Sequence, residues 1–142
     1  MIYTPLTKKA LTLCFEAHKE QRDKSGLPYV FHPFHLAEQM KSEETVICAL
    51  LHDIVEDTHY TLEDLENMGF PKSVIEAIAL LTHDDSVPYM DYVRNIKPNP
   101  IARAVKIEDL KHNSDLTRLD TIDEFSLKRN KKYEEALSIL LN

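Results

Sequence analysis

Glycine is scarce in this sequence. Only 2 of the 142 residues are glycine, and the β-branched residues are scattered rather than alternating along the chain. This composition argues against a protein built on β-sheet and favours helices. Apolar residues still make up 43% of the chain, which is enough for one domain with a hydrophobic core. We therefore expect an all-α fold.

Membrane and secretion signals are also missing. No apolar run approaches the ~20 residues that a membrane-spanning helix requires. The N-terminal stretch MIYTPLTKKA lacks the basic and then apolar pattern of a secretory signal. The two cysteines, Cys14 and Cys48, are explained more simply as small core residues in a reducing compartment than as a disulfide or as thiolate ligands. These features predict a cytoplasmic protein with no membrane partner.

Basic residues are not in excess. The chain has 17 Lys and Arg against 24 Asp and Glu, and its formal net charge is −7. A nucleic-acid-binding surface needs a basic stripe, so we expect no nucleic-acid partner. A small phosphorylated ligand can still bind if a metal ion and a few local cations supply positive charge. The oligomeric state stays open, because apolar residues in the last helix are equally well explained as core.

Capping residues, prolines and apolar spacing predict an all-α bundle of about seven or eight helices. They cover approximately residues 5–22, 33–40, 42–57, 61–69, 71–83, 89–97, 100–119 and 124–141. We find no repeat, no low-complexity tract and no interdomain linker. The sequence therefore predicts a single domain over residues 1–142.

The stretch LLHDIVEDT, residues 50–58, places four ionisable residues in an apolar helix. Residues His52, Asp53, Glu56 and Asp57 share one helical face, and the other directions are filled by apolar side chains. We expect this face to look into the protein rather than at water. Burying an unpaired charge costs several kcal/mol or shifts its pKa, so such groups need a compensating partner.

A divalent metal ion would supply that compensation. Two imidazoles, His32 and His52, and two carboxylates, Asp53 and Asp109, form a ligand set that suits Mn²⁺, Fe²⁺ or Zn²⁺. The absence of nearby cysteines argues against a structural zinc site. Taken singly, His32 is more typical of a loop hydrogen-bonding residue and Asp109 of a solvated or capping residue. We expect removal of the metal to leave Asp53 and Asp109 close together and uncompensated.

Three segments carry a resemblance to a known family: HKEQRDKSGLPYVFHP (18–33), ALLHDIVEDT (49–58) and VKIEDLKHN (105–113). In their order and separation they resemble the HD-domain metal phosphohydrolases. Within that family they are similar to the hydrolase domain of RelA/SpoT-type proteins and to the small alarmone hydrolases. The resemblance implies an all-α HD-domain bundle that removes pyrophosphate from the 3′ position of guanosine tetra- or pentaphosphate.

The resemblance also implies roles for particular residues. The metal, typically Mn²⁺, is held in that family by the residues matching His32, His52, Asp53 and Asp109. The pair matching Glu56 and Asp57 positions or activates the attacking water. The residues matching Lys24 and Asn113 contact the nucleotide.

The spacing of these residues agrees with those roles. Glu56 follows His52 by one turn, so its carboxylate could reach a metal-bound water and act as a general base. Asp57 could orient Glu56 or that water. Asn113 follows Asp109 by one turn on the same helical face. Lys24 could pair with phosphate, although a solvated loop residue is an equally good interpretation.

Four positions differ from the usual alarmone hydrolase pattern. Asp23 stands where that pattern has arginine, Glu108 and Leu110 replace an alanine and an arginine, and Leu116 replaces a threonine. The positions for metal and water are intact, whereas those for the nucleotide are altered. The sequence therefore supports phosphohydrolase chemistry more strongly than it supports the alarmone as substrate. The alternatives are hydrolysis of another small nucleotide and a non-catalytic module that senses a nucleotide or metal.

Overall fold

The computed structural model of the protein describes residues 1–142 and consists of helices. The α-helices are α1 (Pro5–His18), α2 (Phe31–Glu38), α3 (Glu43–Leu51), α4 (Ile54–Asp57), α5 (Leu62–Asn67), α6 (Lys72–Leu81), α7 (Tyr89–Ile96), α8 (Pro100–Asn113) and α9 (Glu124–Leu141), with a 3₁₀ helix, η1, at Leu116–Arg118. The only β pairing is an isolated bridge between Arg22 and Pro28. The predicted all-α class is confirmed.

Side-chain caps start several helices where the sequence predicts them. Thr4, Ser42 and Thr61 each accept a hydrogen bond from a backbone N–H three residues later, and each capping box is closed by a bond back to the cap residue. The Asn99 side chain caps α8 at the N–H of Ala102 (2.9 Å). These bonds satisfy N–H groups that the first turn of a helix leaves without partners.

The predicted third helix, residues 42–57, is not continuous. It ends as α3 at Leu51, and α4 starts again at Ile54. At this break the His52 ring donates from Nδ1 to the carbonyl oxygen of Ala49 at 2.7 Å, and Asp53 has φ −104° and ψ 2°. A side chain that bonds a nearby backbone carbonyl competes with the regular helical pattern. His52 itself keeps helical dihedrals, with φ −58° and ψ −31°, so the break changes the direction of the chain from Asp53 onward.

Other helix ends also differ from the prediction. α1 ends at His18 rather than near residue 22, and α2 begins at Phe31 rather than at Pro33. The predicted helix 100–119 ends at Asn113, because the backbone becomes extended at Asp115, with φ −75° and ψ 95°. The separate η1 segment follows.

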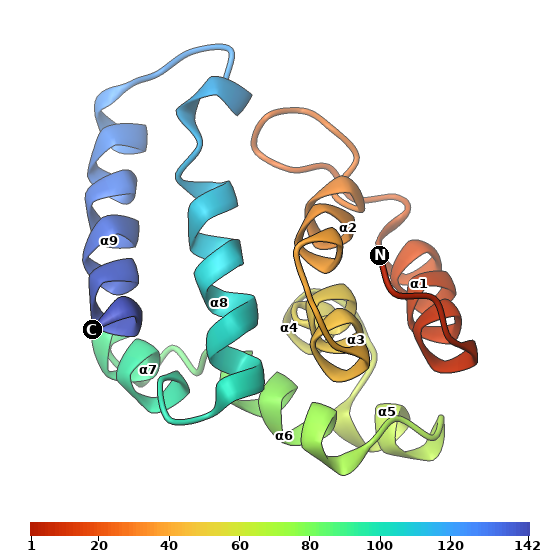
Figure 1. Cartoon of the computed structure of the whole chain (residues 1–142). Helices are drawn as coiled ribbons and strands as arrows, with labels where there is room; N and C mark the ends of the chain where they lie inside the picture. Colours follow the sequence, from red (N-terminus) through yellow and green to blue (C-terminus); the bar gives the residue numbers. More distant parts are fainter.

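Helix α3 lies at the centre of the fold and packs against α1, α2, α6 and α8. All of its residues from Val46 to Leu51 are buried. In Figure 1, α8 and α9 lie side by side on the left and α1 lies on the right, with α2 and α3 between them. The loop that joins α1 to α2 and the segment with η1 lie at the same end of the bundle.

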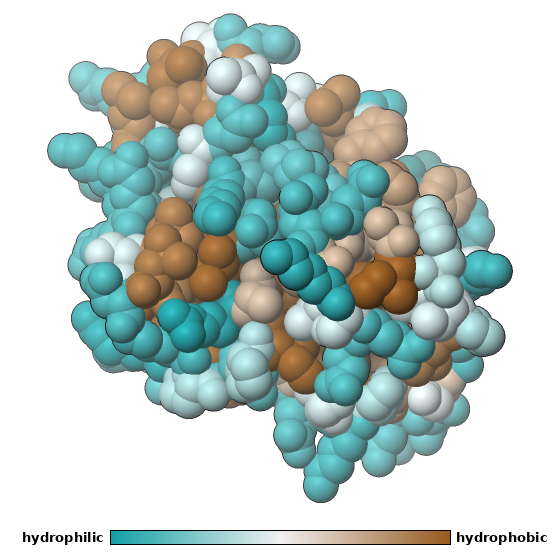
Figure 2. All heavy atoms as spheres, in the orientation of Figure 1, coloured by the Kyte–Doolittle hydropathy of each residue, from teal (hydrophilic) through white to brown (hydrophobic).

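Hydrophobic side chains on the face drawn in Figure 2 form separate patches within a largely hydrophilic surface. Cys14 and Cys48 are both buried and free, as predicted. No helix combines the length and the apolar character that crossing a membrane would demand.

We expect Ile78→Ala to lower the free energy of unfolding by about 2–5 kcal/mol, because the side chain is fully buried on α6 and its loss leaves a cavity. The matched control is Ile122→Ala, since Ile122 is 52% exposed and should change stability little. Denaturant unfolding followed by circular dichroism measures both. Equal effects in the two variants would contradict the assignment of Ile78 to the core.

Candidate metal centre and cavity

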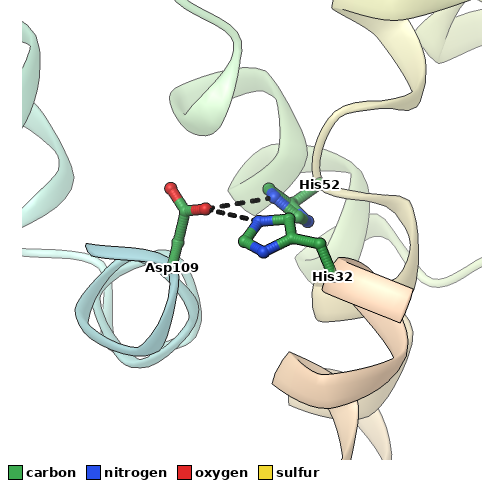
Figure 3. Close-up of side chains that lie close together, drawn as sticks. All are labelled: His32, His52 and Asp109. Atoms are coloured by element: carbon green, nitrogen blue, oxygen red, sulfur yellow. Dashed lines mark hydrogen bonds and ion pairs between the residues drawn. The ribbon is translucent and has the colours of Figure 1, made fainter. Parts of the chain in front are cut away.

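Three of the predicted metal ligands meet where α2, the end of α3 and α8 approach one another. The ligand atoms of His32, His52 and Asp109 all lie within 4.8 Å of one another, and the three residues are buried. Oδ1 of Asp109 is 2.8 Å from Nε2 of His32 and 3.6 Å from Nε2 of His52. In Figure 3 one oxygen of Asp109 is directed towards both imidazoles.

The fourth predicted ligand, Asp53, lies beside this group rather than within it. Its Oδ2 is 3.1 Å from Nε2 of His52, and the Tyr29 hydroxyl donates a hydrogen bond to the same oxygen. Its side chain is 25% exposed and lines a cavity that His32 also lines. The structure therefore brings all four predicted residues into one region, with Asp53 on the cavity side.

The chemistry of His52 fits a cation at this position. Its Nδ1 donates to Ala49, which leaves Nε2 as the ring atom that can bind a cation. Nε2 is buried, makes no hydrogen bond and faces the carboxylates of Asp53 and Asp109 at 3.1 and 3.6 Å. Burial alone would lower the pKa of His52, but the negative charges of Asp53 and Asp109 outweigh it and raise the pKa well above its usual value. A site that draws a proton so strongly is suited to a divalent ion, and its imidazole and carboxylate donors match Mn²⁺, Fe²⁺ or Zn²⁺.

A buried lysine corrects one expectation. Lys106 Nζ lies 2.9 Å from Oδ2 of Asp109, one turn away on α8, and the side chain of Lys106 is 12% exposed. Burial would raise the pKa of Asp109, but Lys106 and the two imidazoles hold that pKa well below its usual value. The expectation that Asp109 is uncompensated without a metal is therefore wrong, because Lys106 supplies a positive charge inside the protein.

A second correction concerns Glu56 and Asp57. We expected them to face the interior with His52, but both are exposed, because the break before α4 changes their direction. Glu56 accepts a hydrogen bond from the backbone N–H of His83. Partial desolvation raises the pKa of Glu56 and of Asp57, and the nearby charge of Asp53 adds to both shifts.

A cavity of about 300 Å³ opens beside His32 and Asp53. Both residues predicted to contact the nucleotide, Lys24 and Asn113, line it. The amide nitrogen of Asn113 donates to Oδ1 of Asp109 at 3.1 Å, so this residue joins the cavity to the ligand group. The cavity thus begins at the histidine–aspartate cluster and extends to α9.

Lysine and arginine side chains gather in and beside this cavity. Lys24 and Arg129 line it, and neither forms an ion pair. Burial lowers the pKa of Lys24, and the nearby charges of Arg129 and Lys132 lower it further. Cations that repel one another without an acidic partner are suited to binding an anion.

The comparisons with known proteins agree with this arrangement. Residues 10–112 match the model of an HD domain family. The chain belongs to the HD-domain family.

Two relatives and one solved structure illustrate the relationship. The chain is 33% identical over 146 residues to the guanosine-3′,5′-bis(diphosphate) 3′-pyrophosphohydrolase MESH1 of Danio rerio, covering 93% of this chain and 80% of that protein. It is 38% identical over 88 residues to the bifunctional (p)ppGpp synthase/hydrolase SpoT of Escherichia coli K12, but the match covers 59% of this chain and spans only 12% of that protein. A solved metazoan orthologue of SpoT, described as hydrolysing ppGpp, matches with a TM-score of 0.77 at 23% identity, over 99% of this chain and 86% of that one.

The structure shows where the four residues that differ from the usual alarmone hydrolase pattern lie in this HD domain. Asp23 does not leave a free carboxylate in the cavity, because its Oδ2 pairs with Nη2 of Arg118 at 2.9 Å. Leu110 is fully buried in the core. Oε1 of Glu108 lies 3.5 Å from Nζ of Lys111 on α8. Leu116 lines the cavity. Asp23 and Leu116 thus change the cavity wall, whereas Glu108 and Leu110 do not line it, and the histidine–aspartate cluster of the HD domain is intact.

Sequence reasoning missed several residues of the HD-domain site. Lys106 could have been found from its spacing, three residues before Asp109 on one helical face. Tyr29 lies in the proline-flanked loop before His32, but nothing in the sequence indicates its bond to Asp53. Arg129 carried no local signal, since only the packing of α9 on α8 brings it to the cavity.

We expect Lys106→Met to lower the free energy of unfolding of the metal-free protein by about 3–5 kcal/mol at neutral pH, because Asp109 would lose its buried cation. The control is Lys111→Met on the same helix, where the pair with Glu108 is largely exposed and contributes less than about 1 kcal/mol. Urea unfolding in the presence of a chelator measures both. Similar small losses in the two variants would show that Asp109 does not depend on Lys106.

Proposed function

We propose that this chain is a metal-dependent phosphohydrolase that acts on a small phosphorylated nucleotide. The first substrate to test is guanosine 3′,5′-bis(diphosphate), from which it would release the 3′-pyrophosphate. The observation that carries the proposal is the buried cluster of His32, His52 and Asp109 beside a cavity lined by unpaired cations. The names of the relatives, MESH1 and SpoT, support the same reaction.

In this proposal His32, His52, Asp53 and Asp109 hold the metal, and Mn²⁺ is the ion that we expect, with Fe²⁺ and Zn²⁺ as alternatives. When bound, such an ion lowers the pKa of a water molecule and neutralises charge on a phosphoryl oxygen. The unpartnered Nε2 of His52 supports its role as a ligand. Tyr29 and Lys106 each occupy one carboxylate oxygen, on Asp53 and Asp109 respectively, and so fix the orientation of these groups.

Lys24 and Asn113 bind the nucleotide in this proposal, and Arg129 joins them. Lys24 and Arg129 supply positive charge for phosphate groups, because both line the cavity without an ion pair of their own. Asn113 lines the cavity and donates to Asp109, which supports a contact between its amide and a phosphate group of the substrate.

Glu56 is the proposed general base, and Asp57 assists it. The raised pKa of Glu56 brings this carboxylate closer to the range in which it can accept a proton from water. In the structure its carboxylate is held by the N–H of His83, which limits its rotation. Asp57 adds a second carboxylate next to it, able to orient the water.

The proposal also covers the domain organisation of the chain, the class of its partner and its cellular compartment. One hydrophobic cluster runs from Ala10 to Leu140, which supports a single HD domain over residues 1–142. The net charge of −7 favours a small nucleotide over a nucleic acid as partner. Free buried cysteines agree with a reducing cytoplasm.

Glu56→Gln tests the catalytic part of the proposal. With Mn²⁺, the unaltered protein should release pyrophosphate from guanosine 3′,5′-bis(diphosphate), and the variant should lower kcat by about 100-fold or more, because the general base is lost. Isothermal titration with Mn²⁺ should give the same affinity for both proteins. Glu66→Gln, an exposed change on α5, is the control and should keep full activity.

The result also separates the alternatives. Activity on other phosphorylated nucleotides but not on the alarmone would assign a different substrate to the same chemistry. Background-level turnover on the whole nucleotide panel by both the unaltered protein and Glu56→Gln would favour a sensor that binds without hydrolysis.

Removal of the metal should lower the melting temperature. An ion that binds only the folded state stabilises it by about 2.7 kcal/mol at a free concentration of 100 times its Kd. Differential scanning fluorimetry with Mn²⁺ and then with excess chelator measures the shift. His52→Ala is the control, because loss of one ligand should make the melting temperature insensitive to Mn²⁺. An unaltered protein whose melting temperature does not respond to Mn²⁺ would contradict a tight metal site.

A further inference from the structure

We propose that His112 is a positioning residue for the metal centre: its ring holds His32 so that Nε2 of His32, which lies 2.8 Å from Oδ1 of Asp109, is directed towards the ion. This inference rests on the proposed function, because it concerns the same metal. His112 lies on α8 and is partly buried, and it is not one of the metal-binding candidates. Its effect on the metal passes entirely through His32.

The geometry of the two rings supports a directed hydrogen bond. Nδ1 of His32 and Nδ1 of His112 are 2.7 Å apart. The ring planes differ by only 10°, and the ring centroids are 5.0 Å apart, about the sum of the nitrogen–nitrogen distance and the two ring radii. The rings therefore lie nearly in one plane and meet edge to edge, not face to face. In this arrangement the N–H of one ring is directed along the lone pair of the other, as a strong hydrogen bond requires.

The proton positions follow from the metal. If Nε2 of His32 binds an ion with its lone pair, the ring must carry its proton on Nδ1. That N–H then donates to Nδ1 of His112, which accepts with its own lone pair and carries its proton on Nε2. His52 shows the same principle, since its Nδ1 donates to the carbonyl of Ala49 at 2.7 Å and leaves Nε2 facing the site. Metal-binding histidines commonly have such a partner on the second nitrogen.

His112 is itself held from two sides. The ring of His35 stacks on it, with centroids 4.2 Å apart and planes 24° apart. Its backbone carbonyl accepts a hydrogen bond from Nη1 of Arg118 at 2.8 Å. The stacking restricts the rotation of the ring, and the bond from Arg118 fixes the backbone that carries it, so the acceptor atom stays in the plane of the His32 ring.

The test compares His112→Phe with His112→Asn. Phenylalanine keeps a flat ring against His35 but has no acceptor, whereas the amide oxygen of asparagine can accept a hydrogen bond. We expect the Mn²⁺ dissociation constant to rise about 10–100-fold in His112→Phe and to stay within a few-fold of the unaltered value in His112→Asn. Electron paramagnetic resonance of free Mn²⁺ measures these constants without any assay of activity. His112→Leu is a second variant without an acceptor, for use if the phenylalanine variant does not fold.

Controls separate positioning from general stability. His59→Phe removes a histidine that stacks on Tyr60 with centroids 4.3 Å apart, and it should leave Mn²⁺ affinity unchanged. The melting temperature of each metal-free variant shows that it is folded. Equal affinity in His112→Phe and the unaltered protein, or equal weakening in the phenylalanine and asparagine variants, would overturn the role of His112 alone. Failure of the unaltered protein to bind Mn²⁺ would instead overturn the metal site, and this role with it.

Discussion

The site depends on one constraint, which is that the buried carboxylate of Asp109 must be neutralised. Asp109 is 5% exposed, and an ionised carboxylate at such a position is costly unless it is paired. Lys106 and Asn113, one turn on either side of it on α8, bond to its two oxygens. The imidazoles reach it from α2 and from the end of α3. Packing of α8 against these helices therefore builds the hydrophobic core and the ligand cluster together, so that neither can be displaced without the other.

Local signals in the sequence predicted most of the helices and much of this cluster. The cap residues Thr4, Ser42 and Thr61 marked helix starts correctly because a capping bond involves only residues within one turn. The placement of Asn113 beside Asp109 followed from helical spacing for the same reason. The break at His52 was not predicted, because the bond from its ring to Ala49 is one of several that a histidine can make, and the buried surroundings select it. The exposure of Glu56 and Asp57 follows from that break and was missed with it.

Contacts between segments that are far apart in the sequence could not be predicted from the spacing of residues. Asp23 and Arg118 are 95 positions apart, yet their ion pair joins the loop before α2 to η1 and closes one side of the cavity. This pair explains how the chain accommodates an acid where the alarmone hydrolase pattern has arginine, since Arg118 cancels its charge. Positive charge available for a phosphate is then left to Arg22, Lys24 and Arg129, which line the cavity without an ion pair. The cavity wall thus keeps cations on two segments, the loop between α1 and α2 and helix α9.

The distribution of charge reconciles an acidic protein with an anionic substrate. The carboxylates of Asp53 and Asp109 lie at the cluster, where they favour a cation. Burial would lower the pKa of His52, but these two charges raise it well above its usual value. Lysine and arginine side chains gather across the cavity, where burial and the charges of Arg129 and Lys132 lower the pKa of Lys24. A phosphorylated nucleotide bound between them would place its negative charge against the cations and against an ion held by the carboxylates. Because buried and partly buried charges are screened less than exposed ones, this local separation outweighs the net charge of −7 in deciding what the cavity binds.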